Sequence, residues 1–183
     1  MLNTVTAIRI DTARSLAAAA LERAGTSPEN AASVAEALIA AERDDIASHG
    51  LSRVAFYADQ VAAGKVAGQA TPSVDTKGGV VRVDAGTGFA YPALDAGFQP
   101  LLTQARRHGI AAVAITNSHH FGVAGHFVER LADQGLVGLG FGNAPAAIAP
   151  WGPSLLHICC CRPPPSVSAC TATVLFSIRH YCK

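Results

Sequence analysis

Cysteine is absent from the chain upstream of Cys159, and all five cysteines of the 183 residues lie between Cys159 and Cys182. The main part of the sequence therefore offers no cysteine–histidine dyad, and it also lacks a P-loop and a conspicuous pair of catalytic acids. An excess of charge is lacking as well: the formal net charge is +1, so nothing in the composition indicates binding to nucleic acid or to an anionic membrane.

Long uninterrupted apolar segments are also scarce. Charged residues such as Arg9, Asp11 and Arg14 interrupt the N-terminal region, which excludes the apolar core of a signal peptide there. Residues 135–161 contain no charged residue, but Asn143 and several prolines and glycines argue against a membrane-spanning helix. Half of the residues are hydrophobic, and a globular protein is expected.

The N-terminal residues 1–68 are predicted to form a helical module. Asp11 is a candidate cap for a first helix that stops at Gly25, and Ser27-Pro28-Glu29 is a typical helix start for a second. A third helix follows His49-Gly50. On it, His49, Arg53 and Tyr57 recur every four residues, opposite an apolar stripe. Two interpretations stay open: a solvated face, or a clamp in which Arg53 binds a carboxylate.

Residues 80–143 alternate between strand and helix patterns in the order β-α-β-α-β, which predicts an α/β fold with a parallel or mixed sheet. We expect residues 69–152 to form this second module. Gly86-Thr87-Gly88 begins an apparent dinucleotide fingerprint, but Tyr91 occupies the sixth position, where close packing requires glycine or alanine. An ordinary turn is therefore expected here instead of a Rossmann phosphate loop.

The most informative segment is GIAAVAITNSHHFGVAGHF at residues 109–127. An apolar strand ends at Thr116, and His119 and His120 follow directly, at the strand end where open α/β sheets place their ligands. A neutral histidine can remove the proton of an alcohol, and an arginine can hold a carboxylate, as the oxidation of a 2-hydroxy acid by a nicotinamide cofactor requires. Structural histidines, or a zinc site that includes His126, are the alternatives. The histidine spacing is not typical of zinc ligands, and no metal site is expected.

Three motifs resemble the malate/L-lactate dehydrogenase type 2 family, which includes ureidoglycolate and sulfolactate dehydrogenases. They are AERDDIASHGLSR (residues 41–53), GIAAVAITNSHHFG (109–122) and GLVGLGFGNAPAAIAPWG (135–152), in the family's order and spacing. The resemblance implies a non-Rossmann oxidoreductase that interconverts a malate- or lactate-like 2-hydroxy acid and its 2-oxo acid with NAD or NADP.

The resemblance also implies residue roles and assembly. His120 would donate or accept the proton, with His49 in the same catalytic pocket. Arg53 and Tyr57 would bind the substrate, and Asn143 would contact the cofactor. The family forms cytoplasmic homodimers, and no nucleic acid or membrane partner is implied.

The segment from Pro153 to Lys183 departs from the family, whose members exceed 300 residues and usually continue to a Gly-Thr-Asn-Pro motif. CCC, PPP and the lack of acids fit an out-of-frame translation, and we expect residues 153–183 to be aberrant and disordered. This truncated chain is accordingly expected to be inactive. The alternatives are a non-catalytic fragment that associates with a full-length homologue, a genuine ending, or a metal-binding tail, although CCC lacks the spacing usual in zinc sites.

Overall fold

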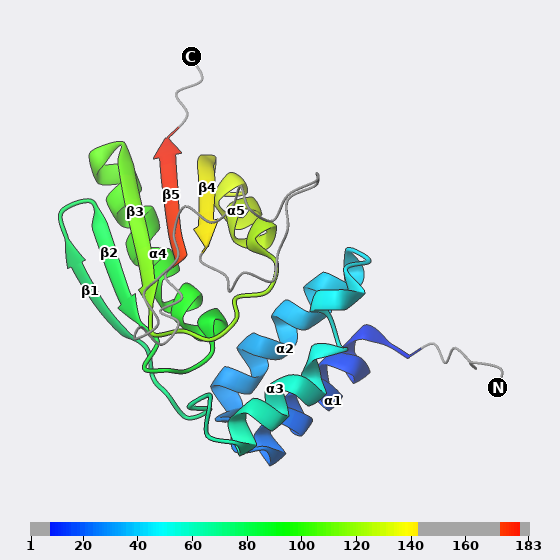
Figure 1. The fold of residues 1–183 in the computed structure, drawn as a ribbon. Helices are drawn as coiled ribbons and strands as arrows, with labels where there is room; N and C mark the ends of the chain where they lie inside the picture. Colours follow the sequence, from blue (N-terminus) through cyan, green and yellow to red (C-terminus); the bar gives the residue numbers. More distant parts are fainter. Residues whose placement is uncertain (1–7, 143–172, 180–183) are drawn as a thin grey trace, which may run out of the picture.

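A computed structural model describes residues 8–142 and 173–179. Three helices come first and a sheet with two further helices follows (Figure 1). The helices are α1 (Ile10–Arg23), α2 (Pro28–Arg43), α3 (Arg53–Ala62), α4 (Ala90–His108) and α5 (Ala124–Ala132), with a 3-10 turn at Ala47–His49. The strands are β1 (Ser73–Lys77), β2 (Val80–Asp84), β3 (Ile110–Thr116), β4 (Leu136–Gly142) and β5 (Thr173–Arg179). The predicted α/β class is confirmed, and the division into modules at residue 68 stays a prediction.

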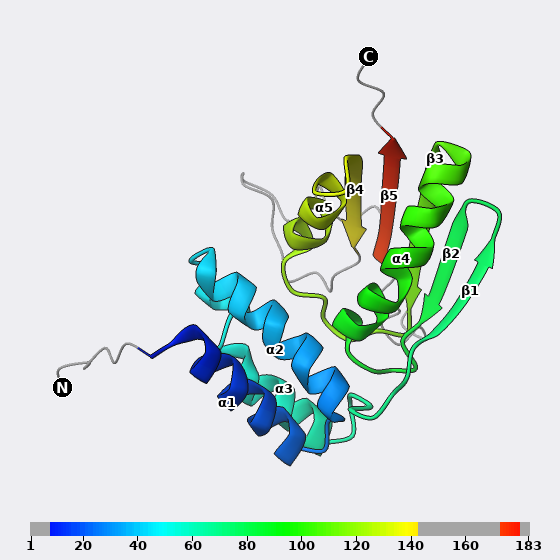
Figure 2. The same ribbon diagram turned by 180° about the vertical axis from the view of Figure 1, so that it is seen from behind.

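Helices α1, α2 and α3 lie side by side and form the helical module (Figures 1 and 2). As predicted, Pro28 is the first residue of α2, and the Ser27 hydroxyl accepts a hydrogen bond from the Asn30 backbone N–H at 3.3 Å. The predicted cap at Asp11 is wrong: Arg9 occupies the N-cap position of α1, and Asp11 lies in the first turn.

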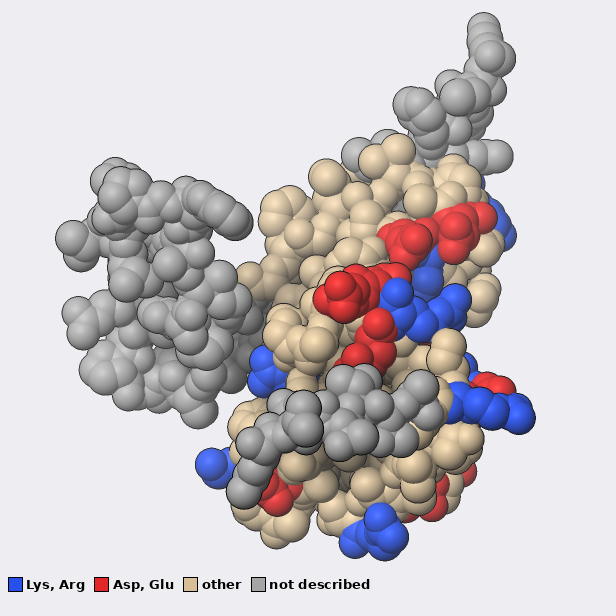
Figure 3. Space-filling model, turned by 90° about the vertical axis from the view of Figure 1, so that its right-hand side faces the viewer, with Lys and Arg blue, Asp and Glu red and all other residues tan. Residues whose placement is uncertain are grey.

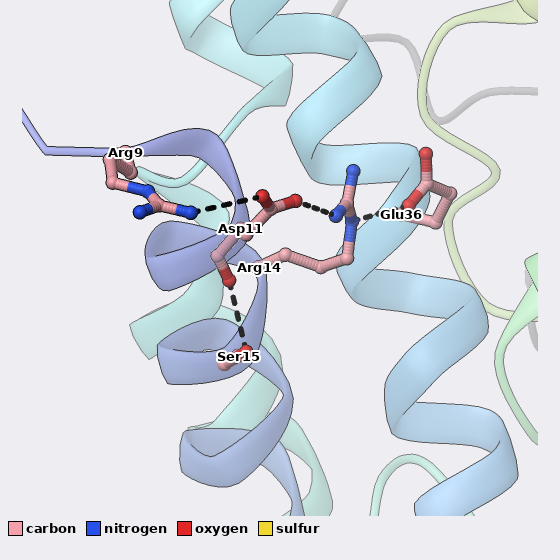
Figure 4. A network of polar contacts seen from close by, with 5 residues as sticks. All are labelled: Arg9, Asp11, Arg14, Ser15 and Glu36. Atoms are coloured by element: carbon pink, nitrogen blue, oxygen red, sulfur yellow. Dashed lines mark hydrogen bonds and ion pairs between the residues drawn. The ribbon is translucent and has the colours of Figure 1, made fainter.

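Asp11 instead takes part in a polar network between α1 and α2 (Figure 4). Its carboxylate lies 2.7 Å from Arg14 Nη1, and Arg14 Nε lies 2.6 Å from Glu36 Oε2 on α2. The carboxylate is thus used by a side chain one turn along the helix, which explains why it does not cap the backbone. All three groups are at least one-third exposed, so the network orients the helices more than it stabilises them.

The sheet is mixed, with the strand order β1-β2-β3-β5-β4. Strand β2 pairs in parallel with β3, and β1 pairs antiparallel with β2. Because the chain returns through α4 and then α5 while moving in one direction across the sheet, both helices cover the same face (Figure 2). Alternate residues of β2 and β3 are buried under α4: Val81, Val83, Val113 and Ile115.

Strand β5 differs from the expectation of a disordered tail over its seven residues. It lies between β3 and β4 and pairs antiparallel with both. The order β2-α4-β3-α5-β4 was predicted from the apolar runs, but β3 and β4 are not neighbours because β5 separates them. Strand β4 is an edge strand, and Val137, Leu139 and Phe141 on it are 41–56% exposed.

Candidate active site at the end of strand β3

The candidate site lies where the parallel strands β2 and β3 end at the same edge of the sheet. The loop after β3 is fastened to the loop after β2: Thr87 N donates to Asn117 O at 2.8 Å, and His119 N donates to Gly88 O at 2.9 Å. Asn117 adopts the left-handed conformation, with φ of 50°, and its side-chain amide donates to Asp84 Oδ2 at 3.0 Å. These contacts fix the turn that presents His119 and His120.

A chain of hydrogen bonds holds the His120 ring at its Nδ1 atom. The Tyr57 hydroxyl lies 2.8 Å from His120 Nδ1, and the Tyr91 hydroxyl lies 3.0 Å from that of Tyr57. The Gly122 backbone N–H also donates to His120 Nδ1, at 3.3 Å. Tyr57 comes from α3 and Tyr91 from the first turn of α4, so three separate parts of the chain converge on one imidazole nitrogen.

Tyr57 is wholly buried and Tyr91 is 3% exposed. The interpretation of His49, Arg53 and Tyr57 as a solvated face is therefore wrong for Tyr57. A helical wheel places it opposite the apolar stripe, but α3 packs with this side chain in the core, against the rings of Phe89 and Tyr91. His49 is not on α3 at all, because it ends the 3-10 turn before the helix.

Two further histidines, His49 and His119, lie close to His120. The His49 ring stacks on that of His120, with centroids 5.4 Å apart and planes inclined by 28°. His119 turns the other way and meets the rings of Tyr57 and Phe89 edge-on, at 5.6 and 6.1 Å. The two adjacent histidines thus make different contacts: His120 takes part in the hydrogen-bond chain, and His119 packs among aromatic rings.

Arg53 stands beside these rings. Its Nε donates to Ser48 O at 2.6 Å, and its guanidinium lies 6.0 Å from the centre of the Phe56 ring. Within the described part of the chain, its two terminal nitrogens make no hydrogen bond. The held Nε orients the guanidinium, whose terminal nitrogens have the geometry with which arginine can bind a carboxylate through two hydrogen bonds.

Burial and positive charge keep the imidazoles neutral. Desolvation, with the nearby charge of Arg53, lowers the pKa of His120 to about 4. Desolvation also lowers the pKa of His119, and desolvation with the charge of Arg53 lowers that of His49. Burial raises the pKa of Tyr57 and of Tyr91, so both hydroxyls keep their protons at neutral pH.

A cavity of about 390 Å³ adjoins the site between α2, α4 and α5. His49 and Tyr91 line it, whereas Arg53, His119 and His120 do not. Its wall is otherwise rich in charge, with His126 Nε2 2.6 Å from Asp44 Oδ2 and Arg130 Nη1 2.8 Å from Asp95 Oδ1. Acidic and basic side chains also lie next to one another across the face of the molecule shown in Figure 3.

The structure brings together four of the five predicted site residues, His49, Arg53, Tyr57 and His120. The fifth, Asn143, lies outside the described residues. His126 is held by Asp44 and lies on α5, away from the loop that carries His119 and His120. In residues 8–142 and 173–179, no three metal-ligating side chains gather to hold an ion, and none of the helices has the length and apolarity needed to cross a membrane.

Tyr91 is the residue that sequence reasoning missed. Its position was noted only because it breaks the glycine fingerprint. No local sequence pattern links it to the site. In the structure the link is Gly122, whose φ is +69° and where a Cβ would collide with the Tyr91 hydroxyl. Glycine at position 122 thus makes room for a hydroxyl 31 residues earlier in the sequence.

The described residues form an α/β protein with a mixed sheet and a histidine-rich site where β2 and β3 end. A family model described as malate/L-lactate dehydrogenase matches residues 8–155, and the chain belongs to this family. The resemblance noted in the three sequence motifs is confirmed.

Known relatives in this family are considerably longer than the chain. The chain is 52% identical over 145 residues to a (2R)-3-sulfolactate dehydrogenase (NADP(+)) of Chromohalobacter salexigens, a match that covers 79% of the chain and 44% of the relative. It is 42% identical over 151 residues to a Δ1-pyrroline-2-carboxylate/Δ1-piperideine-2-carboxylate reductase of Pseudomonas putida, covering 82% and 44%. The chain therefore spans less than half the length of these relatives.

Solved structures also superpose on most of this chain, which again covers less than half of each of them. A Δ1-piperideine-2-carboxylate reductase from Pseudomonas syringae superposes with a TM-score of 0.71 at 41% identity, covering 74% of this chain and 41% of that one. A malate dehydrogenase from Entamoeba histolytica superposes with a TM-score of 0.71 at 29% identity, covering 77% and 40%.

Proposed function

We propose that the chain carries the substrate-binding and proton-transfer residues of an NAD(P)-dependent oxidoreductase that interconverts a 2-hydroxy acid and a 2-oxo acid. The observation that carries the proposal is the convergence of His120, His49 and Arg53 at the carboxyl end of β3, in a chain of the malate/L-lactate dehydrogenase family. The names of the relatives, an NADP-linked dehydrogenase and two imine-carboxylate reductases, support the same chemistry.

Arg53 binds the substrate carboxylate in this proposal, and its held Nε sets the direction of the guanidinium. His120 exchanges a proton with the substrate oxygen through Nε2, because Nδ1 already serves Tyr57 and Gly122. His49 stacks on His120 and limits the tilt of its ring. Tyr57 was predicted to bind substrate, but its side chain is buried and its hydroxyl is committed to His120 and Tyr91, so we assign it to positioning His120.

The described residues fit a polar ligand next to His120. Ser118 Oγ and His119 Nδ1 are buried and have no hydrogen-bond partner within the described part of the chain. Buried polar atoms normally find partners, so these two are the groups that would meet a bound cofactor or substrate. A reduced nicotinamide, when bound, supplies the hydride. Asn143 remains the proposed cofactor contact, as the family resemblance implies.

The substrate half of the proposal can be tested on the chain itself with oxamate, an unreactive mimic of a 2-oxo acid, followed by NMR. We expect saturable shifts of the Arg53 and His120 side-chain signals. Arg53→Met should weaken binding at least about 10-fold, since a hydrogen-bonded charge contributes about 1.5–3 kcal/mol. Arg107→Met, which removes an exposed arginine at the end of α4, is the matched control and should bind like the unmodified chain. Equal binding by Arg53→Met would refute the assignment.

The reaction is tested by following NADH and NADPH oxidation with 2-oxo acids and cyclic imine carboxylates. We propose that the truncated chain turns over little or nothing, and turnover at an ordinary enzyme rate would refute this. Any rate that the chain shows should fall at least about 100-fold in His120→Asn, the typical contribution of a positioned acid–base group. We further propose that the whole protein is a cytoplasmic homodimer, as the family resemblance implies. Light scattering on the purified protein measures its assembly state.

A further inference from the structure

The hydrogen bonds around His120 Nδ1 have a direction. The Gly122 N–H can only donate, so the Nδ1 atom that it approaches at 3.3 Å must be an acceptor. The Tyr57 hydroxyl at 2.8 Å is then the second donor to Nδ1, and its oxygen is free to accept from the Tyr91 hydroxyl at 3.0 Å. In the neutral ring the proton therefore lies on Nε2, with the chain of donors running from Tyr91 through Tyr57 to His120.

Tyr91 occupies a distinctive place in this chain. It is 3% exposed, yet it belongs to the wall of the 390 Å³ cavity that also contains the Asp44–His126 pair. Among the described residues, the Tyr57 hydroxyl is the one hydrogen-bond partner of the Tyr91 hydroxyl. Gly122, which has no Cβ, leaves the space that the Tyr91 hydroxyl fills.

We infer that Tyr91 and Tyr57 form a hydroxyl relay that favours the Nε2–H tautomer of neutral His120 and leads from its Nδ1 atom to Tyr91, a residue in the wall of the cavity between α2, α4 and α5. Tyr91 is a positioning residue in this relay, because it acts on His120 through Tyr57. The tautomer follows from the described contacts alone, whereas the use of the relay in turnover rests on the proposed function.

In the reduction of a 2-oxo acid, the Nε2–H bond of His120 breaks as its proton moves to the substrate oxygen, and Nδ1 takes a proton from the Tyr57 hydroxyl. Tyr57 is reprotonated by Tyr91, and Tyr91 by water in the cavity. One proton enters at Tyr91, one leaves at Nε2, and His120 exchanges one neutral tautomer for the other. The depressed pKa of His120 agrees with this, because an imidazole that is neutral at pH 7 holds no second proton to give. Oxidation runs in reverse and starts from the Nδ1–H tautomer: Nε2 takes the alcohol proton, and the Nδ1 proton leaves through Tyr57 and Tyr91 to water.

The relay is tested by ¹⁵N NMR of histidine-labelled full-length chain without ligand, in which the two ring nitrogens report which one carries the proton. Comparison with His120→Asn assigns the signals. The unmodified chain should show protonated Nε2 and unprotonated Nδ1 at pH 7.5. Tyr57→Phe removes one of the two donors to Nδ1. It should raise the population of the Nδ1–H tautomer about fivefold, the equilibrium effect of one ordinary hydrogen bond.

Tyr91→Phe distinguishes the relay from a simple contact. Without the Tyr91 donor, the Tyr57 oxygen is free to accept from Nδ1–H, so the Nδ1–H population should rise to a level between those of the unmodified chain and Tyr57→Phe. Thr103→Val, which removes an exposed hydroxyl from the same helix, is the control and should leave the tautomer unchanged.

A predominant Nδ1–H tautomer in the unmodified chain would overturn the inference, and so would a Tyr91→Phe spectrum identical to that of Thr103→Val. Because no ligand is present, neither result depends on oxamate binding or turnover. A failure of the relay is therefore separable from a failure of the proposed function.

Discussion

Two of the contact regions between helices α1–α3 and the rest of the described chain are built from opposite chemistry. In the site, Tyr57 of α3 meets Tyr91 and His120 through neutral groups, and the two tyrosine side chains are buried. In the charged seam, Asp44 at the end of α2 pairs with His126 of α5, and Ser33 of α2 donates to Asp95 of α4 at 2.6 Å. Asp95 also pairs with Arg130 of α5, and these contacts are charged and part-exposed. Buried neutral hydrogen bonds fix geometry, whereas exposed ion pairs contribute little net stability because water competes for both partners.

The sharpest test of this contrast is Tyr57→Ala. Removing a fully buried aromatic ring should lower the free energy of unfolding by about 3–5 kcal/mol, as for other large core rings. Urea unfolding followed by circular dichroism measures the loss. Tyr57→Phe keeps the ring and should cost about 1–3 kcal/mol, since it leaves buried polar partners unmatched. A loss below about 1 kcal/mol for the alanine variant would show that the site is not a structural anchor.

The second prediction concerns pH. An unfolded histidine binds a proton below about pH 6.5, but burial and the charge of Arg53 lower the pKa of folded His120 to about 4. Between these values the unfolded state binds more protons, so the unfolding free energy should fall as pH drops from about 6.5 toward 4. His119 and His49, whose pKa values are also lowered, add to the trend.

His120→Asn should make the dependence shallower in urea titrations at pH 7, 6, 5 and 4.5. An equally steep dependence in this variant would mean that His120 is not desolvated in the folded chain.

The smallest effect is expected in the charged seam. Asp95→Asn removes the carboxylate that Arg130 and Ser33 share, yet it should cost less than about 1 kcal/mol, and the difference should shrink in 0.5 M salt. Arg130 also lies over the Phe98 ring, 4.2 Å from its centre, which holds the guanidinium in place without Asp95. If Asp95→Asn lowered the free energy of unfolding as much as Tyr57→Ala does, the charged seam and the buried site would not differ in their contribution to stability.

Local signals in the sequence were sufficient for part of this picture. Ser27-Pro28 marked the start of α2, and the polar residues after Thr116 marked the end of β3, because capping and strand termination depend on neighbouring residues. The same pattern placed His120 at a sheet edge. The family resemblance then supplied roles that no periodicity could supply.

The remaining features depend on contacts between distant residues. Tyr57 belonged to the polar side of a helical wheel, and only the packing of α3 against Phe89 and Tyr91 shows that it is buried. The position of β5 between β3 and β4 is likewise a matter of backbone pairing over more than 30 residues, which no local pattern encodes. The prediction for Asp11 was wrong for the same reason on a smaller scale: its carboxylate accepts a hydrogen bond from Arg14 and does not cap the helix.

The close approach of the Tyr91 hydroxyl to Gly122 has an evolutionary consequence. While the hydroxyl is present, any side chain at position 122 meets both the tyrosine and an unfavourable φ of +69°. Once position 91 has lost its hydroxyl, the closest contact is gone, but the ring carbons Cε1 and Cζ would still lie 3.0 and 3.1 Å from a Cβ at position 122, so the ring must also shift slightly. Residues that tolerate left-handed backbone, such as asparagine, then become easier to place at position 122. The two positions are thus expected to change in a fixed order along a lineage, with 91 first. A reversion to tyrosine would be blocked as soon as 122 had gained a side chain.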